Sequence, residues 1–347
     1  MKYRKLGTTD LDVSVICLGT MTWGEQNNQD DGFQQMDYAF ERGVNFFDTA
    51  EVYSIPTRAE TYGKTEEIIG NWFAQNNKRK DVILATKICA KSEGNSWIRD
   101  GGPNLIFDKK NINAAIDGSL KRLKTDYIDL YQLHAPERKV PKFGKLDFEY
   151  DPEDSWVELE EVLSCLQDLV KQGKVRHIGV SNETPWGTMK YLSFSSERFP
   201  RIRTIQNPYS LLNRTFEVGN AEVCHRENIG LLAYSPLAFG VLTGKYLKDT
   251  PPDSRLGLYG DWFTRYSNKP SLDAVSKYIK LAKEFSMTPT QLALAFVNSR
   301  PFLTSNIIGA TKMSQLEENI DSTEISLNTE ILEAIEEIHV SNPNPAP

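Results

Sequence analysis

Short runs of β-branched and apolar residues alternate along the chain with segments whose apolar residues recur at helical spacing. Several short runs are apolar at successive positions, as expected of parallel strands covered on both faces. Strands are predicted at residues 13–18, 44–47, 82–86, 128–133, 175–180, 202–205, 231–233 and 305–308. Helical periodicity is clearest at residues 111–124, 156–171 and 217–227. Eight strands alternating with helices predict an α/β fold, a (β/α)8 barrel forming a single domain over residues 1–347.

The predicted connections differ in length according to their direction. Links from a helix into the next strand are short, whereas the links after Lys87, His134 and Tyr234 run to about 20, 20 and 35 residues. In a barrel all strand-to-helix loops emerge on one face, where active sites are built. The extra chain is therefore expected on the face that carries chemistry. The Pro-rich ending, residues 341–347, is expected to be a loosely ordered tail.

Composition and charge limit the classes of partner and the cellular location that we expect for this chain. Lys and Arg total 40 and Asp and Glu total 47, so the net charge is −7, which argues against nucleic acid or an anionic membrane as a partner. The sequence contains no apolar stretch of membrane-spanning length and no signal-peptide pattern. The 4 cysteines are far apart in the sequence and are expected to be reduced, mostly buried thiols. We therefore expect a cytoplasmic protein.

Polar residues stand where the predicted strands end. One such residue could be a satisfied structural group, but six ends converging on one rim favour a site at the mouth of the barrel. The strand-end residues are Asp48, Lys87, His134, Ser181 with Asn182, Gln206 with Asn207, and Tyr234 with Ser235.

The chemistry of these residues favours work on a carbonyl group. Tyr53 follows Asp48 closely, and a phenol with a pKa near 10 donates a proton usefully only when a cation stabilises its phenolate. Lys87 can supply that cation, Asp48 can hold the ammonium, and His134 can orient a substrate oxygen. Together they would polarise and protonate a carbonyl oxygen, which is half of a reduction; the other half is a hydride.

The sequence carries no standard nucleotide fingerprint. No G-x-G-x-x-G follows a strand, and residues 240–246 lack the spacing and the hydroxyl of a Walker loop. A glycine-bearing loop whose N–H groups line a phosphate stays open as an interpretation. Tyr234 could stack on a flat heterocycle or simply be a core aromatic, and Ser181, Asn182 and Gln206 could bind a carboxamide.

In combination, the strand-end motifs resemble the aldo-keto reductase superfamily over essentially the whole chain. The motifs are LGTMTWG at 18–24, FDTAEVY at 47–53, ATK at 85–87, LYQLH at 130–134, IGVSN at 178–182, QNPYS at 206–210, AYSPL at 233–237 and IGA at 308–310. The resemblance implies a (β/α)8 barrel, the catalytic tetrad Asp48, Tyr53, Lys87 and His134, and NADP(H) as cofactor without a metal. Tyr53 would be the general acid for hydride transfer from the nicotinamide to an aldehyde or ketone.

The resemblance also implies the cofactor contacts. Ser181, Asn182 and Gln206 would hold the carboxamide, and Tyr234 would stack on the nicotinamide. The remaining implied contacts are Gly19, Thr20, Met21, Asp48, Ser235, Pro236, Leu237, Ala238, Gly240, Leu242, Gly244, Lys245, Gly309, Ala310, Thr311, Lys312, Gln315, Glu318 and Asn319. Many members have Arg where Gln315 stands, and Gln cannot supply that charge to a 2′-phosphate. Lys312 or the start of the following helix would then take that role.

The implied substrate pocket is aromatic. Its residues would be Trp23, Tyr53, Trp97, His134, Phe143 and Trp262, which suit a flat or apolar aldehyde or ketone. Trp97, Phe143 and Trp262 could instead pack the loops. The expected partner is this small-molecule substrate, with the chain a monomer or weak homo-oligomer.

Two other functions stay open. Some members of the superfamily are cofactor-bound channel subunits with slow turnover, so a binding module with an intact tetrad is one alternative. A lyase that forms a Schiff base on Lys87 is the other, although Asp48 and Tyr53 would stabilise the ammonium and oppose it.

Overall fold

The structure, a computed structural model, describes residues 1–91, 93–99, 105–196, 198–260 and 263–347. Eight parallel strands close into a barrel in the order β10-β3-β4-β5-β6-β7-β8-β9. They are β3 (Ile16–Gly19), β4 (Phe46–Asp48), β5 (Ile83–Ile88), β6 (Ile128–Leu133), β7 (Val175–Ser181), β8 (Ile202–Pro208), β9 (Gly230–Tyr234) and β10 (Leu303–Ile308). The predicted (β/α)8 barrel is therefore confirmed.

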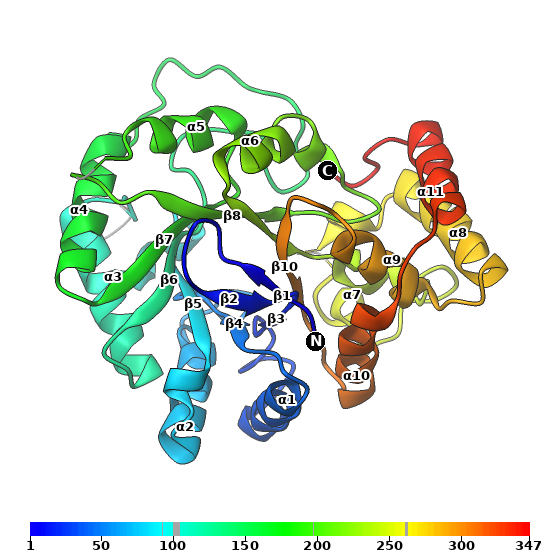
Figure 1. Cartoon of the computed structure of the whole chain (residues 1–347), viewed down its shortest axis with the longest axis horizontal. Helices are drawn as coiled ribbons and strands as arrows, with labels where there is room; N and C mark the ends of the chain where they lie inside the picture. The colour runs from blue at the N-terminus through cyan, green and yellow to red at the C-terminus, as the bar shows by residue number, and fades with distance from the viewer. Residues whose placement is uncertain (92, 100–104, 197, 261–262) are drawn as a thin grey trace.

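Helices surround the barrel (Figure 1). They are α1 (Gln29–Glu41), α2 (Lys64–Asn76), α3 (Lys109–Leu123), α4 (Leu159–Lys171), α5 (Pro185–Ser193), α6 (Asn220–Glu227), α7 (Arg255–Tyr259), α8 (Lys269–Glu284), α9 (Pro289–Asn298), α10 (Met313–Asp321) and α11 (Thr329–Ser341). The helix predicted at 217–227 is divided, because Gly219 adopts φ of 107° and α6 begins only after it.

A hairpin closes the other end of the barrel from the long loops. The predicted strand 13–18 is two strands: β2 (Asp12–Ser14), which pairs antiparallel with β1 (Tyr3–Lys5), and β3. The chain leaves the hairpin at Val15, whose amide donates to Lys2 rather than to the barrel. The hairpin, dark blue in Figure 1, lies across the barrel, and its fully buried Leu6 joins the side chains of the barrel interior.

The core has two layers separated by the barrel wall. Because successive strand residues point to opposite faces, Phe46 packs inside the barrel whereas Phe47 packs outward toward α2. This rigid double layer fixes the strand ends and so fixes where the loops begin.

The C-terminal tail, expected to be loosely ordered, is packed against the body of the protein. Ala346 is fully buried and its amide donates to the Leu212 carbonyl at 3.1 Å. The Pro347 carbonyl accepts from Arg265 at 2.6 Å, and Asn344 accepts from the Arg214 amide at 2.6 Å. After Ser341, the last residue of α11, the tail forms no helix or strand, so these hydrogen bonds to distant segments take the place of a backbone ladder.

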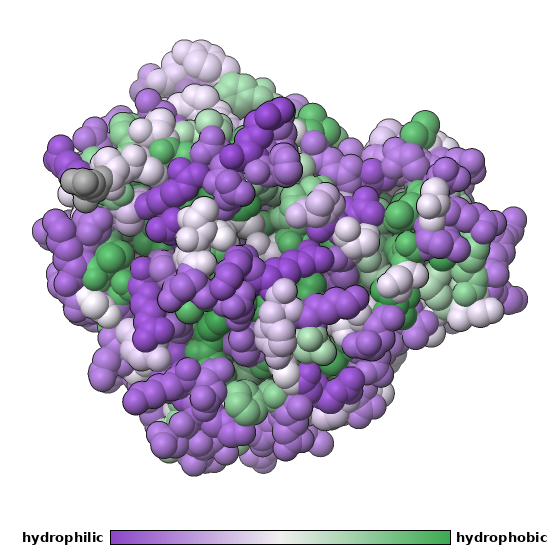
Figure 2. Space-filling model, in the orientation of Figure 1, coloured by the Kyte–Doolittle hydropathy of each residue, from purple (hydrophilic) through white to green (hydrophobic). Residues whose placement is uncertain are grey.

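The face seen in Figure 2 is mostly hydrophilic, with small separate hydrophobic areas. All 4 cysteines are free and buried. Within the described residues, no helix is long and apolar enough to cross a membrane. Across the same ranges, no group of three or more His, Cys, Asp or Glu side chains is arranged to hold a metal ion.

Candidate active site

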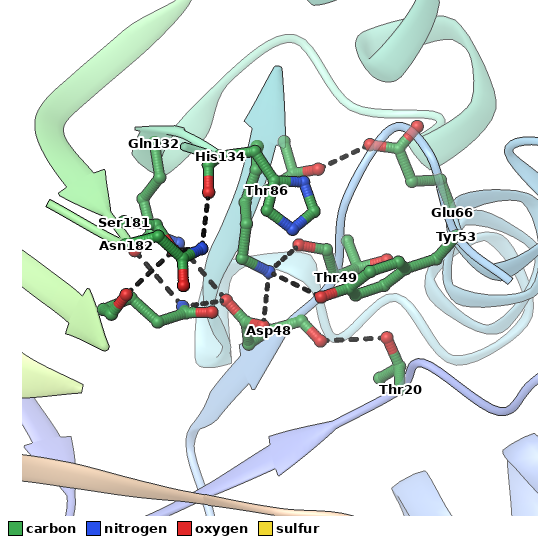
Figure 3. A network of polar contacts seen from close by, with 12 residues as sticks. Thr20, Asp48, Thr49, Tyr53, Glu66, Thr86, Gln132, His134, Ser181 and Asn182 are labelled. Atoms are coloured by element: carbon green, nitrogen blue, oxygen red, sulfur yellow. Dashed lines mark hydrogen bonds and ion pairs between the residues drawn. The ribbon is translucent and has the colours of Figure 1, made fainter. Parts of the chain in front are cut away.

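A polar network at the carboxyl ends of the strands includes Asp48, Thr49 and Tyr53 (Figure 3), and Lys87 hydrogen-bonds to all three. Its Nζ donates to Asp48 Oδ2 and to the Thr49 carbonyl, each at 2.7 Å, and lies 3.5 Å from the Tyr53 hydroxyl. The Lys87 side chain is fully buried and that of Asp48 is 3% exposed. All three N–H groups of the ammonium therefore have an oxygen acceptor.

The charge state of Lys87 follows from these contacts. Burial alone lowers the pKa of Lys87, but the charge of Asp48 and the hydrogen bonds to Asp48 and Tyr53 outweigh it, so its pKa is raised above the usual 10.5. The amine is consequently an ammonium at neutral pH. A protonated amine is a poor nucleophile, which disfavours the Schiff-base alternative.

Asp48 is held by more than Lys87. Its Oδ1 accepts from Gln206 Nε2 at 2.9 Å and from Gln132 Nε2 at 3.2 Å, and its carbonyl accepts from Thr20 Oγ1 at 2.9 Å. Oδ2 is thereby left to face Lys87. Gln132 is a fully buried residue of β6 that sequence reasoning left without a role; its place in the LYQLH motif was the available signal.

Tyr53 and His134 face each other across the site. Their rings lie 5.6 Å apart at 77°, an edge-to-face arrangement. Burial raises the pKa of Tyr53 and Lys87 lowers it, with a net rise above 10. Burial and the charge of Lys87 hold the pKa of His134 well below 6.5. At neutral pH the structure thus presents a protonated phenol and a neutral imidazole, two groups able to hydrogen-bond one oxygen.

The residues predicted to hold a carboxamide form a second cluster beside the first. Ser181 Oγ donates to the Gln206 carbonyl at 2.8 Å, and Asn182 Nδ2 donates to the His134 carbonyl at 2.8 Å. The Tyr234 hydroxyl donates to Asn182 Oδ1 at 2.6 Å. The strand ends of β6, β7, β8 and β9 are therefore linked to one another at this rim.

The loop after β9 is held by its own backbone hydrogen bonds. Ala238 and Leu242 are buried at 0% and 1% exposure, and their amides donate to the carbonyls of Ser235 and Leu237 at 2.9 and 3.2 Å. Gly240 has φ of 88°, and a Cβ there would approach Lys245 Cε and Nζ to 3.0 Å. The exposed Lys245 side chain thus lies over Gly240, one of two glycines with positive φ in this loop, the other being Gly244 with φ of 83°. Ser235, Pro236, Leu237 and Gly244 complete the same loop.

The predicted adenosine end gathers where β10 meets α10. Gln315 Oε1 accepts from the Thr311 amide at 2.9 Å, so this side chain is already hydrogen-bonded to the backbone that leads into α10. Glu318 accepts from Thr288, and Lys312 pairs with Asp253 at 3.3 Å. A Cβ on Gly309 would meet nothing within 4 Å, whereas Ala310 is buried. Asn319 Oδ1 is buried and has no hydrogen-bond partner among the residues that the structure describes.

The strand end of β3 is closely packed. A Cβ on Gly19 would come within 2.7 Å of the Ile308 carbonyl, and Thr20 is fully buried. The carbonyl of Met21 accepts from the Ile55 amide at 3.1 Å. Gly19 and Thr20 therefore pack the rim between β10 and β4, and Met21 is joined to the segment after β4 through its backbone.

The residues expected to form an aromatic pocket lie in different surroundings. Trp23 is fully buried, and its indole N–H donates to Gln35 Oε1 at 3.3 Å, so it presents no exposed surface to the expected pocket. The ring packs under α1, where Gly32 leaves room for it. Trp97 is 40% exposed and stands edge-on to Tyr62, and Phe143 is 55% exposed. Trp262 lies outside the described residues.

Arg255, at the start of α7, is a cation that sequence reasoning missed. Its guanidinium carbon lies 5.2 Å from the Phe239 ring centre and 5.8 Å from that of Phe263. Burial lowers the pKa of Arg255, and its charge acts on Tyr53. Within the described ranges it has no carboxylate partner closer than 4 Å, which leaves its donors for an anion.

Comparison with known proteins agrees with this geometry. The Aldo/keto reductase family model matches residues 15–340. Protein tas of Escherichia coli is 46% identical over 349 residues, covering 100% of both chains. The uncharacterized oxidoreductase YrpG of Bacillus subtilis is 36% identical, over 97% of this chain and 96% of its own. A "Probable voltage-gated potassium channel subunit beta" of Arabidopsis thaliana is 29% identical, over 99% and 98%.

The family model matches residues 15–340 of a chain whose eight parallel strands close into a barrel and carry a buried Lys87–Asp48 pair beside a phenol. The chain belongs to the aldo/keto reductase family, whose members are oxidoreductases.

Proposed function

We propose that this protein reduces aldehydes or ketones with NADPH and that Tyr53 is the general acid. The proposal rests on the fully buried Lys87 ammonium. Its Nζ lies 2.7 Å from Asp48 Oδ2 and 3.5 Å from the Tyr53 hydroxyl. A cation held there lowers the cost of forming a phenolate as the proton leaves.

Each residue of the tetrad has a distinct part. Asp48 keeps Lys87 charged and aimed, and Lys87 stabilises the negative charge that develops on Tyr53. Tyr53 gives its proton to the carbonyl oxygen, which becomes the hydroxyl of the product alcohol. The neutral imidazole of His134 orients that oxygen. Solvent then returns a proton to the phenolate, so the site ends as it began.

NADPH, when bound, supplies the hydride. The fit is supported by the unpartnered Asn319 Oδ1, which can accept from an adenine amino group, and by the open space beside Gly309. Lys245, Lys312 and Arg255 offer positive charge to phosphates. Ser181, Asn182 and Gln206 would hold the carboxamide, and Tyr234 would cover the nicotinamide ring. Because Gln315 is uncharged, we assign the 2′-phosphate to Lys312.

The test is Tyr53→Phe. It should lower kcat by at least about 100-fold, since general acids contribute that much, and should leave the Kd for NADPH nearly unchanged. Tyr278→Phe is the matched control: its buried hydroxyl donates to the Leu211 carbonyl at 3.2 Å, away from the tetrad. A Tyr53→Phe protein that keeps full turnover, or that loses NADPH binding while folded, contradicts the proposal.

A cofactor-bound subunit with slow turnover is a second candidate. It is favoured by the full-length similarity to the Arabidopsis protein that is named as a channel subunit. Steady-state rates separate the two candidates: tight NADPH binding with no NADPH oxidation across a broad panel of aldehydes and ketones would favour the subunit.

A further inference from the structure

Glu51 lies in the segment that leads from Asp48 to Tyr53, beside the end of β5 that carries Lys87. It is the fourth residue of the DTAEVY segment after β4, and it is 1% exposed. A buried carboxylate without partners would be costly, so its contacts define what it does. Those contacts run in two directions, toward β5 and toward the loop that follows β5.

Toward β5, Glu51 hydrogen-bonds to the backbone at two positions of the strand end. Its amide donates to the Lys87 carbonyl at 3.0 Å, and its Oε2 accepts from the Cys89 amide at 2.9 Å. Tyr53 follows two residues later, in a turn where its amide donates to the Ala50 carbonyl at 3.1 Å. The backbone that carries Tyr53 is therefore attached to the backbone that carries Lys87 through Glu51.

Toward the loop, Glu51 is paired with a cation. Arg99 Nη1 lies 2.5 Å from Glu51 Oε1, and the Tyr62 hydroxyl donates to the same oxygen at 2.8 Å. The Arg99 side chain is only 13% exposed, so the pair is shielded from water and salt. Neither residue contacts the reacting groups, which separates this pair from the tetrad itself.

We propose that Glu51 is a positioning residue that sets the distance between the Tyr53 hydroxyl and the Lys87 ammonium, with Arg99 as its counter-ion. The kinetic part of this inference rests on the proposed function. The geometric part does not, because it concerns only where Tyr53 stands relative to Lys87.

The direction of the effect distinguishes positioning from simple electrostatics. Lys87 lowers the pKa of Tyr53 because it is close, so a looser Tyr53 should have a higher pKa. If Glu51 acted only through its own negative charge, removing that charge would lower the pKa of Tyr53. The two explanations therefore predict opposite signs.

The experiment compares Glu51→Gln with a matched variant, Asp129→Asn. Asp129 is 2% exposed, pairs with Arg79 at 2.8 Å, and accepts from the Leu84 amide of β5 at 3.0 Å. Arg79 is 13% exposed, like Arg99. The control thus removes an equally buried paired carboxylate from β6, beside β5, while leaving the Tyr53 segment untouched.

Two measurements are made on each variant. The phenolate absorbance of Tyr53 is titrated as the difference between each variant and the same variant carrying Tyr53→Phe. The pH profile of kcat is measured with NADPH and a carbonyl substrate, together with the Kd for NADPH.

Glu51→Gln should move the Tyr53 titration and the basic limb of kcat to higher pH. It should lower kcat at neutral pH by about 100-fold, as expected for a small misplacement of a catalytic group, and leave the Kd unchanged. Asp129→Asn should do none of this. Arg99→Lys, which keeps the counter-ion, should stay near the parent, whereas Arg99→Met should resemble Glu51→Gln.

An unchanged or lowered Tyr53 titration in Glu51→Gln would overturn the inference, as would an equal rise in Asp129→Asn. Should Glu51→Gln fail to fold, kcat and the Kd for NADPH of Arg99→Lys and Arg99→Met decide instead, because loss of the Arg99 charge would by itself raise the pKa of Tyr53; an Arg99→Met variant with the kcat of Arg99→Lys would then overturn the inference. A parent protein that reduces no carbonyl would defeat the proposed function, while the titration would still decide the role of Glu51.

Discussion

The buried Asp48–Lys87 pair makes a quantitative prediction about stability. Lys87→Met removes an ammonium that has three oxygen acceptors within 3.5 Å and no exposed surface. Asp48, 3% exposed, would keep its donors Gln132 and Gln206 but lose Lys87, its one ion-pair partner among the described residues. The variant therefore leaves a carboxylate buried beside a methyl group.

The size of the effect follows from the burial. Removing one partner of a buried ion pair costs about 3–5 kcal/mol, because the other charge stays desolvated and unpaired. Asp48→Asn in the Lys87→Met background removes that leftover charge, so the second substitution should cost far less than it does alone. We expect an interaction energy of about 2 kcal/mol, within the range seen for residues in direct contact.

The assay is urea unfolding of the parent, both single variants and the double variant at neutral pH, followed by fluorescence and circular dichroism. The exposed pair Lys5–Asp12, 2.9 Å apart with side chains 56% and 57% exposed, is the control, and Lys5→Met should change stability by less than about 1 kcal/mol. If the two single costs at the buried pair simply add in the double variant, within about 0.5 kcal/mol, the residues are not coupled and the reasoning about Lys87 is refuted.

Three further predictions concern His134, Trp23 and Lys312. The pKa of His134 in the folded protein lies well below 6.5, so its contribution to stability is complete above pH 6.5 and is lost as the pH falls toward that folded value. His134→Gln should therefore lose less stability than the parent does when urea unfolding is repeated at acid pH. An identical acid dependence of the two proteins would contradict this. Trp23→Ala should destabilise the protein by about 3–5 kcal/mol and leave KM unchanged, because the ring is fully buried. A large rise in KM without destabilisation would place Trp23 in the substrate pocket. Lys312→Ala breaks an exposed ion pair and should weaken NADPH binding roughly tenfold, or about 1.4 kcal/mol, in fluorescence titrations. The Kd for NADH should stay unchanged. Equal weakening of both cofactors would show that Lys312 does not bind the 2′-phosphate.

Some features of this protein were determined by local sequence. Apolar runs interrupted by helical periodicity are set by near neighbours in the chain, which is why the barrel strands were predicted to within a few residues. Strand-end polar residues were also predictable, because the carboxyl ends of parallel strands must share one rim. Asp48, Lys87 and Tyr53 met there once the barrel closed.

Other features were decided only by tertiary packing. Trp23 looks like any loop aromatic in the sequence, and its burial depends on Gln35 and Gly32 of a helix that folds back over it. The tail is ordered by donors from distant segments, such as Arg265. Glu51 gains its role from Arg99 and from the amide of Cys89. Periodicity reports which face of an element is apolar, but it contains no information on which distant segment covers a given loop residue, because that depends on the closed shape of the whole barrel.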